Sequence, residues 1–289
     1  MFSSLRKLAP KVLLVLSSLT LLSACSANRL AYNNLDWLIG WKTGEYLSLT
    51  GAQKDWLASR TSQHLAWHCS SELPRYEPLL GDLQSSLYDK ALDAQMLLSG
   101  QPRVEAAVDR LLTEIAPTIS QLLGQLDDEQ VLELRDNLAD KHVELEEKYL
   151  SPDMTTQHRE RIERAEERLE DWLGPLDEEQ RARLALWAAA LQGHNQVWLE
   201  NRKVWQEAFL RALESRGDPD FEERVRSLLI ERKRYWTPQF QRVAEFNREQ
   251  GTHLIVDLMQ MANDRQKARL AKRFEDLRGD IQALQCADA

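Results

Sequence analysis

The amino-acid sequence predicts an all-α protein, an elongated multi-helix bundle of about eight to ten helices. Glycine and proline number only 11 and 9 in 289 residues, whereas Leu, Ala, Glu, Arg and Gln abound. Such a composition favours helices over a sandwich or barrel of short strands. Apolar residues recur every three or four positions in long segments, and no stretch alternates polar and apolar residues long enough to indicate a strand. With 43% hydrophobic residues, the chain is also apolar enough to form a folded core.

The first 24 residues have the composition of a secretory leader. Arg6, Lys7 and Lys11 supply positive charge, no acidic residue occurs, and the apolar run 12–22 follows. As a helix this run would span roughly 16 Å, about half of a hydrocarbon core that is about 30 Å thick. We therefore expect residues 1–24 to be a cleaved signal peptide and not a transmembrane anchor.

The leader ends in Leu22-Ser23-Ala24-Cys25, which resembles the lipobox of bacterial lipoproteins. The resemblance implies cleavage before Cys25, a thioether-linked diacylglycerol and an N-acyl chain on that residue, and a lipidated N-terminus over 25–28. Several chains give lasting attachment because each buried CH2 contributes only about 0.8 kcal/mol. In lipoproteins of this kind, aspartate after the cysteine favours the inner membrane, so with Ser26 the resemblance implies an outer-membrane location facing the periplasm. The alternative is an ordinary cleaved leader with an unmodified Cys25.

Residues 29–289 are expected to form a single all-helical periplasmic domain, with possible sub-bundles at 29–150 and 151–289. Apolar stripes of helical period run through Val104 to Leu126 and through Leu270 to Leu284. A third stripe predicts one long helix from about 178 to 214. Turn-prone residues predict breaks at 98–102, 151–153, 174–175 and 217–219, and Pro117 is expected to kink its helix.

One local pattern, [Thr/Asp/Asn]-x-x-Gln-x-x-x-Leu, occurs four times. The first residue of each copy can cap a helix N-terminus, and the glutamine three residues later can reach back to the backbone of that residue, which makes a capping box. The capping residues are Thr50, Asp127, Asp177 and Asn263, and their glutamines are Gln53, Gln130, Gln180 and Gln266. Because the copies are unevenly spaced, they indicate four helix starts and not a solenoid repeat.

The first copy, Leu49-Thr50-Gly51-Ala52-Gln53, resembles the L-T-x-x-Q motif of the Spy/CpxP-like periplasmic stress proteins. That resemblance implies a curved helical protein that binds partly unfolded clients. A larger part of the chain is similar to a family of uncharacterised proteobacterial lipoproteins. The similar features are the lipobox, YNNLDWLIGW after it, the L-T-x-x-Q start and WHCSSELPRY at 67–76. This second resemblance implies an envelope location and a helical fold.

His64, His68 and Glu72 are candidate metal ligands. They recur every four residues, so on a helix they project from one face and could coordinate Zn²⁺ or Cu²⁺. The same face continues an apolar stripe, and no H-E-x-x-H motif or paired C-x-x-C supports a metal. The default interpretation is that both histidines are ordinary core or surface residues, and we expect no cofactor beyond the lipid on Cys25.

Cys69 and Cys286 are the two cysteines that remain after Cys25. In the oxidising cell envelope they are candidates for a disulfide that would pin the C-terminal helix to an early one. The alternative is two separately buried thiols.

Nine tryptophans are present, and two pairs share a helix face: Trp37 with Trp41, and Trp198 with Trp205. Helical spacing of aromatic residues favours core packing. The alternative is a hydrophobic groove for a peptide or partner helix, or contact of Trp37 and Trp41 with the membrane interface.

The net charge and the motifs that are absent argue against two classes of function, nucleic-acid binding and catalysis. Cleavage of the leader takes the net charge from −9 to about −12, which makes nucleic acid a poor partner. No nucleophile elbow or phosphate-binding glycine loop occurs, so we expect no enzyme. The leading hypothesis is an envelope interaction protein with a protein partner. The alternatives are a chaperone-like helical cradle for unfolded clients and a metal-binding protein or metal-dependent enzyme that uses His64, His68 and Glu72.

Overall fold

The structure, a computed structural model, describes residues 29–191 and 193–284. These residues contain eleven α-helices and no strand, which confirms the all-α prediction. The helices are α2 (Leu35–Gly44), α3 (Gly51–Trp67), α4 (Leu73–Leu87), α5 (Ala94–Gly124), α6 (Asp128–Leu150), α7 (Met154–Leu173), α8 (Glu178–Ala190), α9 (His194–Glu214), α10 (Phe221–Ile230), α11 (Pro238–Met261) and α12 (Asp264–Ala283). A π-helical turn, η2 (His68–Glu72), joins α3 to α4, and a 3₁₀ turn, η3 (Arg232–Tyr235), follows α10.

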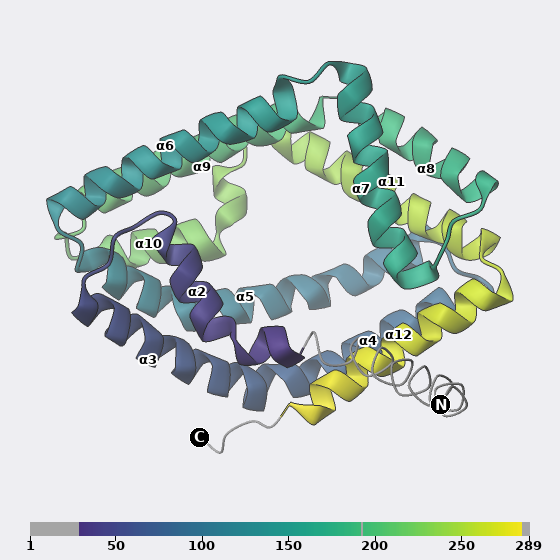
Figure 1. Ribbon diagram of the computed structural model, residues 1–289, viewed down its shortest axis with the longest axis horizontal. Helices are drawn as coiled ribbons and strands as arrows, with labels where there is room; N and C mark the ends of the chain where they lie inside the picture. Colours follow the sequence, from purple (N-terminus) through teal and green to yellow (C-terminus); the bar gives the residue numbers. More distant parts are fainter. Residues whose placement is uncertain (1–28, 192, 285–289) are drawn as a thin grey trace, which may run out of the picture.

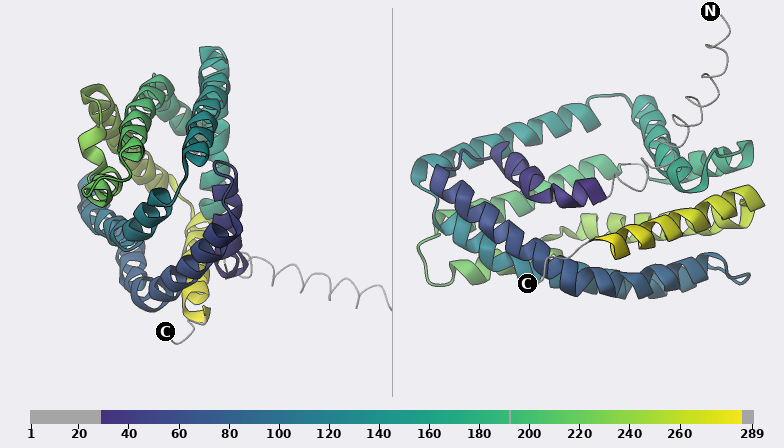
Figure 2. Two further views of the ribbon diagram at one scale, coloured as in Figure 1. Left: turned by 90° about the vertical axis from the view of Figure 1, so that its left-hand side faces the viewer. Right: turned by 60° about the horizontal axis from the view of Figure 1, so that its bottom comes forward.

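The helices follow one another around a ring (Figure 1). In that view α6 and α9 run side by side along the upper side of the ring, and α4 and α12 run side by side along the lower side. The short helix α2 lies across one face of the ring, as the turned views show (Figure 2). The sequence predicted a helical bundle but not its closure into a ring.

Two hydrophobic clusters hold the ring together. One cluster joins α3, the end of α5, α6, α9 and α10 around Leu126, Leu134 and Leu213. The other joins α4, α7, α8, α11 and α12 around Leu184 and Phe274. Each cluster therefore combines segments from both halves of the sequence.

All four predicted capping boxes are present. In each, the capping side chain accepts a hydrogen bond from the backbone N–H of the glutamine, and that glutamine accepts one from the backbone of the cap. The residue before each cap is buried, namely Leu49, Leu126, Leu176 and Ala262. The pattern thus ties the start of a helix to the core on its N-terminal side.

The four glutamines are also joined in two pairs, a contact that the local sequence pattern does not predict. Gln53 and Gln130 donate amide hydrogen bonds to each other's side-chain oxygen at 3.1 and 2.8 Å. Gln180 and Gln266 do the same at 3.1 and 2.9 Å. Since α3 and α6 begin at one end of the ring and α8 and α12 at the other, each pair closes one end (Figure 1).

The prediction of one helix over 178–214 is wrong. The helix ends at Ala190, and a new helix begins at His194 after Gly193, whose φ of 72° lies in the left-handed region that favours glycine. The two pieces have different partners, because α8 packs on α7 and α11 whereas α9 packs mainly on α6 and α10. The apolar periodicity continued across the turn and concealed it.

The predicted break at 98–102 is also wrong, because α5 continues through Pro102 and Pro117. The helix begins at the cap Asp93, whose carboxylate accepts a hydrogen bond of 2.7 Å from the backbone N–H of Met96. Met96 and Leu97 then pack against a core cluster, and this packing holds the first turns helical despite the proline. The other three predicted breaks lie in the links that follow α6, α7 and α9.

Candidate functional site

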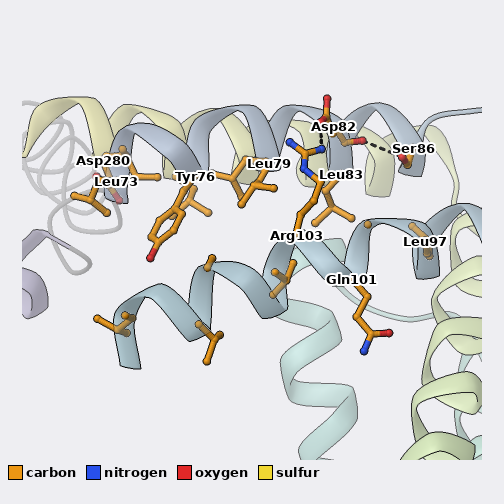
Figure 3. A pocket seen from close by; sticks show the side chains of 18 of the residues that line it. Leu73, Tyr76, Leu79, Asp82, Leu83, Ser86, Leu97, Gln101, Arg103 and Asp280 are labelled. Atoms are coloured by element: carbon orange, nitrogen blue, oxygen red, sulfur yellow. Dashed lines mark hydrogen bonds and ion pairs between the residues drawn. The ribbon is translucent and has the colours of Figure 1, made fainter. Parts of the chain in front are cut away.

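An apolar groove between α4, α5 and α12 is the candidate binding site in the described part of the chain. Its volume is about 840 Å³, within the range of sites that hold small ligands or peptide side chains. We call it the α4–α5–α12 groove. Its apolar lining comprises Leu73, Tyr76, Leu79, Leu80 and Leu83 of α4, Met96, Leu97, Val104, Ala107, Val108 and Leu111 of α5, and Leu277 and Ile281 of α12, with Leu284 beyond it. Figure 3 shows side chains of α4 and α5 on the two walls.

The groove exists because the neighbouring helices cover only part of the apolar stripe of α5. The C-terminal part of the stripe, such as Leu122, is buried in the core, whereas Val104 is 57% exposed and Val108 is 40% exposed. On the facing helix, Leu83 is 45% exposed. The sequence contained this signal in the stripe that begins at Val104, but periodicity alone does not tell a covered apolar face from an open one.

A second apolar cavity of about 550 Å³ adjoins the groove. The two cavities share Leu80, Leu83 and Leu97, and the second one continues between α7, α11 and α12 toward Trp172 and Phe274. Together they form an apolar surface that crosses several elements of the ring. Surfaces of this kind bind apolar segments of partners in many proteins.

Ion pairs lie at the rim of the groove. Arg103 of α5 binds Asp82 of α4 across the gap between the helices (Figure 3). At the other end, Arg29 lies 3.4 Å from the carboxylate of Asp280 of α12. Charged side chains thus flank the apolar floor, and of the two carboxylates Asp82 is exposed whereas Asp280 is buried.

A buried polar cluster closes the end of the groove near η2. Glu72 is 1% exposed and accepts hydrogen bonds of 2.9–3.0 Å from the guanidinium of Arg110 and one of 3.0 Å from Arg75. The hydrogen bonds from Arg110 are the largest cause that lowers the pKa of Glu72 below its usual value. The carboxylate is thus held ionised inside the protein, and it fixes the start of α4 against α5.

His68 lies between two tyrosines in the same cluster. Its Nδ1 is 3.0 Å from the hydroxyl of Tyr32, and its Nε2 is 3.2 Å from the hydroxyl of Tyr76. Since the Tyr32 hydroxyl donates to the carbonyl of Leu65, the arrangement is satisfied when Nδ1–H donates to Tyr32 and Nε2 accepts from Tyr76. Burial lowers the pKa of His68 and raises the pKa of both tyrosines, which favours the neutral ring.

The three candidate metal ligands contact different partners in the structure. His64 contacts Glu114 at 3.2 Å and Thr118 at 2.7 Å, whereas His68 binds tyrosines and Glu72 binds arginines. Over the residues that the structure describes, no three His, Cys, Asp or Glu side chains are grouped so that they could hold a metal ion. Each of the three side chains thus has hydrogen-bonding partners of its own.

Of the cysteines, Cys69 is buried in η2 and is disulfide-bonded. Cys25 and Cys286 lie outside the described residues, so the pairing of Cys69 with Cys286 and the lipidation of Cys25 stay predictions. In the described part of the chain, no helix is at once long enough and apolar enough to cross a membrane.

The two tryptophan pairs differ in environment. Trp205 stacks on Phe209 and donates a 3.0 Å hydrogen bond to the carbonyl of Leu228, and Trp198 packs edge-on against Tyr149. Trp37 and Trp41 of α2, in contrast, are 64% and 56% exposed and stack on each other with ring centres 6.3 Å apart. Trp198 and Trp205 therefore pack against other helices, as the core-packing prediction states, whereas Trp37 and Trp41 are exposed to solvent.

A family model matches the part of the chain that contains most of the residues described above. The model of a family described as "Family of unknown function (DUF6279)" matches residues 45–241, more than half of the chain. The matched region runs from the end of α2 to the first residues of α11, so it includes η2, the capping boxes at Thr50, Asp127 and Asp177, and the α4 and α5 walls of the groove. No curated protein and no solved structure matches the chain. The chain therefore belongs to this family of unknown function, as the resemblance to an uncharacterised family implied.

Proposed function

We propose that the mature protein is a lipoprotein, anchored by acyl chains on Cys25 to the periplasmic face of the outer membrane, that binds an apolar segment of a protein partner and catalyses no reaction. The observation that carries this proposal is the α4–α5–α12 groove, an open apolar site of about 840 Å³. The lipobox at Leu22–Cys25 and Ser26 after it support the location.

The chemistry of the groove favours a protein segment. Leu83, Val104 and Val108 leave much of their apolar surface in solvent, and burying apolar surface contributes about 25 cal/mol per Å². A partner helix could place apolar residues along the two walls while its polar residues meet the rim pair of Arg103 and Asp82.

The test is site-specific photocrosslinking in living cells. A photoreactive residue at position 104, inside the groove, should capture one partner that mass spectrometry identifies. Position 143 is the matched control, since Val143 of α6 is 51% exposed and does not line the groove. Equal capture of the same proteins from both positions would contradict binding in the groove.

The lipid anchor on Cys25 is tested by a separate experiment. Intact mass of the purified mature protein should show residue 25 as the N-terminus with a diacylglycerol and an N-acyl chain, and radioactive palmitate should label the wild type and not the Cys25→Ala variant. A mature chain of unmodified mass would refute the lipid anchor.

A chaperone-like cradle for unfolded clients is the second candidate. Two observations favour it: the capping boxes that resemble the L-T-x-x-Q motif occur in pairs, and the two apolar cavities form one surface across the ring. The mature protein should then suppress the aggregation of a denatured client, and Val104→Asp should weaken this effect while Val143→Asp should not. Aggregation at the same rate with and without the protein would exclude the cradle.

A further inference from the structure

The exposed face of α2 contains the densest group of exposed aromatic side chains on the described surface. Trp37 and Trp41 are one helical turn apart and present a stacked pair of rings to solvent. Leu30, just before the helix, is 65% exposed, and no residue of α2 is buried. An unpartnered aromatic pair of this size marks an interaction surface.

The residues on both sides of α2 in the sequence are held to the ring. The hydroxyl of Tyr32 donates to the carbonyl of Leu65 and contacts His68, and Leu47 and Leu49, after α2, are buried in the core cluster that includes α3. The tryptophans therefore lie on a fixed helix and not on a flexible extension. Figure 2 shows α2 on one face of the ring.

The charge of the segment differs from that of the whole protein. Residues 29–45 contain two basic residues, Arg29 and Lys42, and two acidic residues, Asp36 and Glu45, so the segment is neutral in a chain of net charge −9. Lys42 lies over the Trp41 ring, with its ammonium 5.8 Å from the ring centre. Tryptophan and lysine together are typical of the headgroup layer of a membrane, where amphipathic rings and long basic side chains are stable.

The position of the segment in the sequence places it close to the proposed lipid anchor, which makes a bilayer the partner that we consider for this face. Cys25 precedes Arg29 by four residues, which extend at most about 14 Å. Trp37 lies eight residues further along, or about 12 Å in a helix. A lipid on Cys25 would thus hold Trp37 within about 26 Å of its own attachment point, and Trp41, one helical turn further on, within about 32 Å.

We propose that α2 lies on the bilayer surface, with Trp37 and Trp41 inserted at the boundary of headgroups and acyl chains. The contact turns one face of the ring toward the membrane and fixes its orientation there. The inference uses the proposed lipid anchor only to bring α2 within reach of the bilayer. Because the segment is neutral, burial of the rings drives the contact, and zwitterionic lipid suffices.

The experiment uses purified mature protein in vesicles of phosphatidylcholine brominated near the headgroup end of the acyl chains. Bromine quenches tryptophan fluorescence only at contact distance. We expect quenching of the emission of two of the nine tryptophans, and its loss in the Trp37→Ala/Trp41→Ala variant. A matched control is Leu132→Ala/Leu186→Ala, which removes two exposed apolar side chains of α6 and α8 and should leave quenching unchanged.

The outcomes separate this inference from the anchor. Quenching that is absent, or equal in the wild type and the double tryptophan variant, while intact mass shows the acyl chains, would overturn the α2 contact and leave the anchor standing. If the intact mass of the mature protein shows no acyl chains and its tryptophans are still quenched, the anchor is refuted and the α2 contact is retained. Dimers that dissociate in the tryptophan variant would overturn the inference in favour of a second copy of the chain as the occupant of this face.

Discussion

Gln180 and Gln266 exchange two amide hydrogen bonds at 3.1 and 2.9 Å although 86 residues separate them in the sequence. Each side-chain oxygen also accepts the backbone N–H of its own cap, Asp177 or Asn263. One residue type thus does two tasks: it completes a local cap, and it joins the starts of two distant helices. Gln180 is 0% exposed, so these hydrogen bonds form away from water, where an unmade bond is costly.

Gln180→Ala should lower the free energy of unfolding by about 3 kcal/mol, because the buried amide of Gln266 loses both of its hydrogen bonds to Gln180 and the Asp177 backbone N–H loses its acceptor. Denaturation in urea, followed by circular dichroism, measures the loss. The control Gln241→Ala removes an exposed glutamine of α11 and should stay within about 0.5 kcal/mol of the wild type. The Gln180→Ala/Gln266→Ala variant should lose less than the sum of the single variants; strict additivity would show that the pair is not coupled.

Asn263→Ala should lower the free energy of unfolding by about 1 kcal/mol, since it removes the side chain that accepts the 2.9 Å hydrogen bond from the backbone of Gln266. Asp264→Ala is the comparison. It removes only an acidic side chain from the first turn of α12, which interacts with the helix dipole and contributes a few tenths of a kcal/mol. Equal losses in the two variants would mean that the cap contributes nothing of its own.

The protein should become less stable as the pH falls below about 6.5. Burial lowers the pKa of His68 and of His194 below the ordinary value of 6.5. Between the lowered values and 6.5 the unfolded chain binds protons that the native protein excludes, so stability is full above this window and is lost as the pH falls through it. Urea unfolding at about pH 7.5, 6.5 and 5.5 should show a falling midpoint.

Replacement of one of these histidines tests the cause of the pH effect. His68→Gln keeps polar groups near Tyr32 and Tyr76 but cannot bind the proton, so it should flatten the dependence between about pH 6.5 and 5.5. An unchanged slope in this variant would exclude His68 as a source. Loss at still lower pH has a second cause, because Glu72, whose pKa lies below its ordinary 4.5, must then be protonated.

Reduction of the protein should lower its thermal midpoint, because Cys69 is disulfide-bonded. With Cys286 as partner the closed loop is long, and the bridge is expected to contribute about 5 kcal/mol in the chain-entropy model. Alkylation with and without reductant, followed by peptide mapping, identifies the partner. A free thiol at Cys286 in unreduced protein would contradict the predicted pairing.

The sequence by itself determined the all-α class and the four helix starts. A capping box joins residues only three positions apart, so Thr50 with Gln53 and Asn263 with Gln266 form it wherever the chain lies in space. The same locality explains the three correct breaks, where prolines, glycines or acidic caps end one helix and begin the next.

Only the tertiary structure decided how these helices meet and which apolar faces stay open. The reason is that such contacts join residues far apart in sequence, as Gln53 does with Gln130 and Gln180 with Gln266. The continuation of α5 through Pro102 likewise follows from packing, which outweighs the local preference of one residue. The turn at Gly193 interrupts a helix although the apolar period continues across it. Val104 and Leu122 belong to one apolar stripe, yet α5 extends beyond the helices that cover it, so Leu122 is buried and Val104 is exposed in the groove.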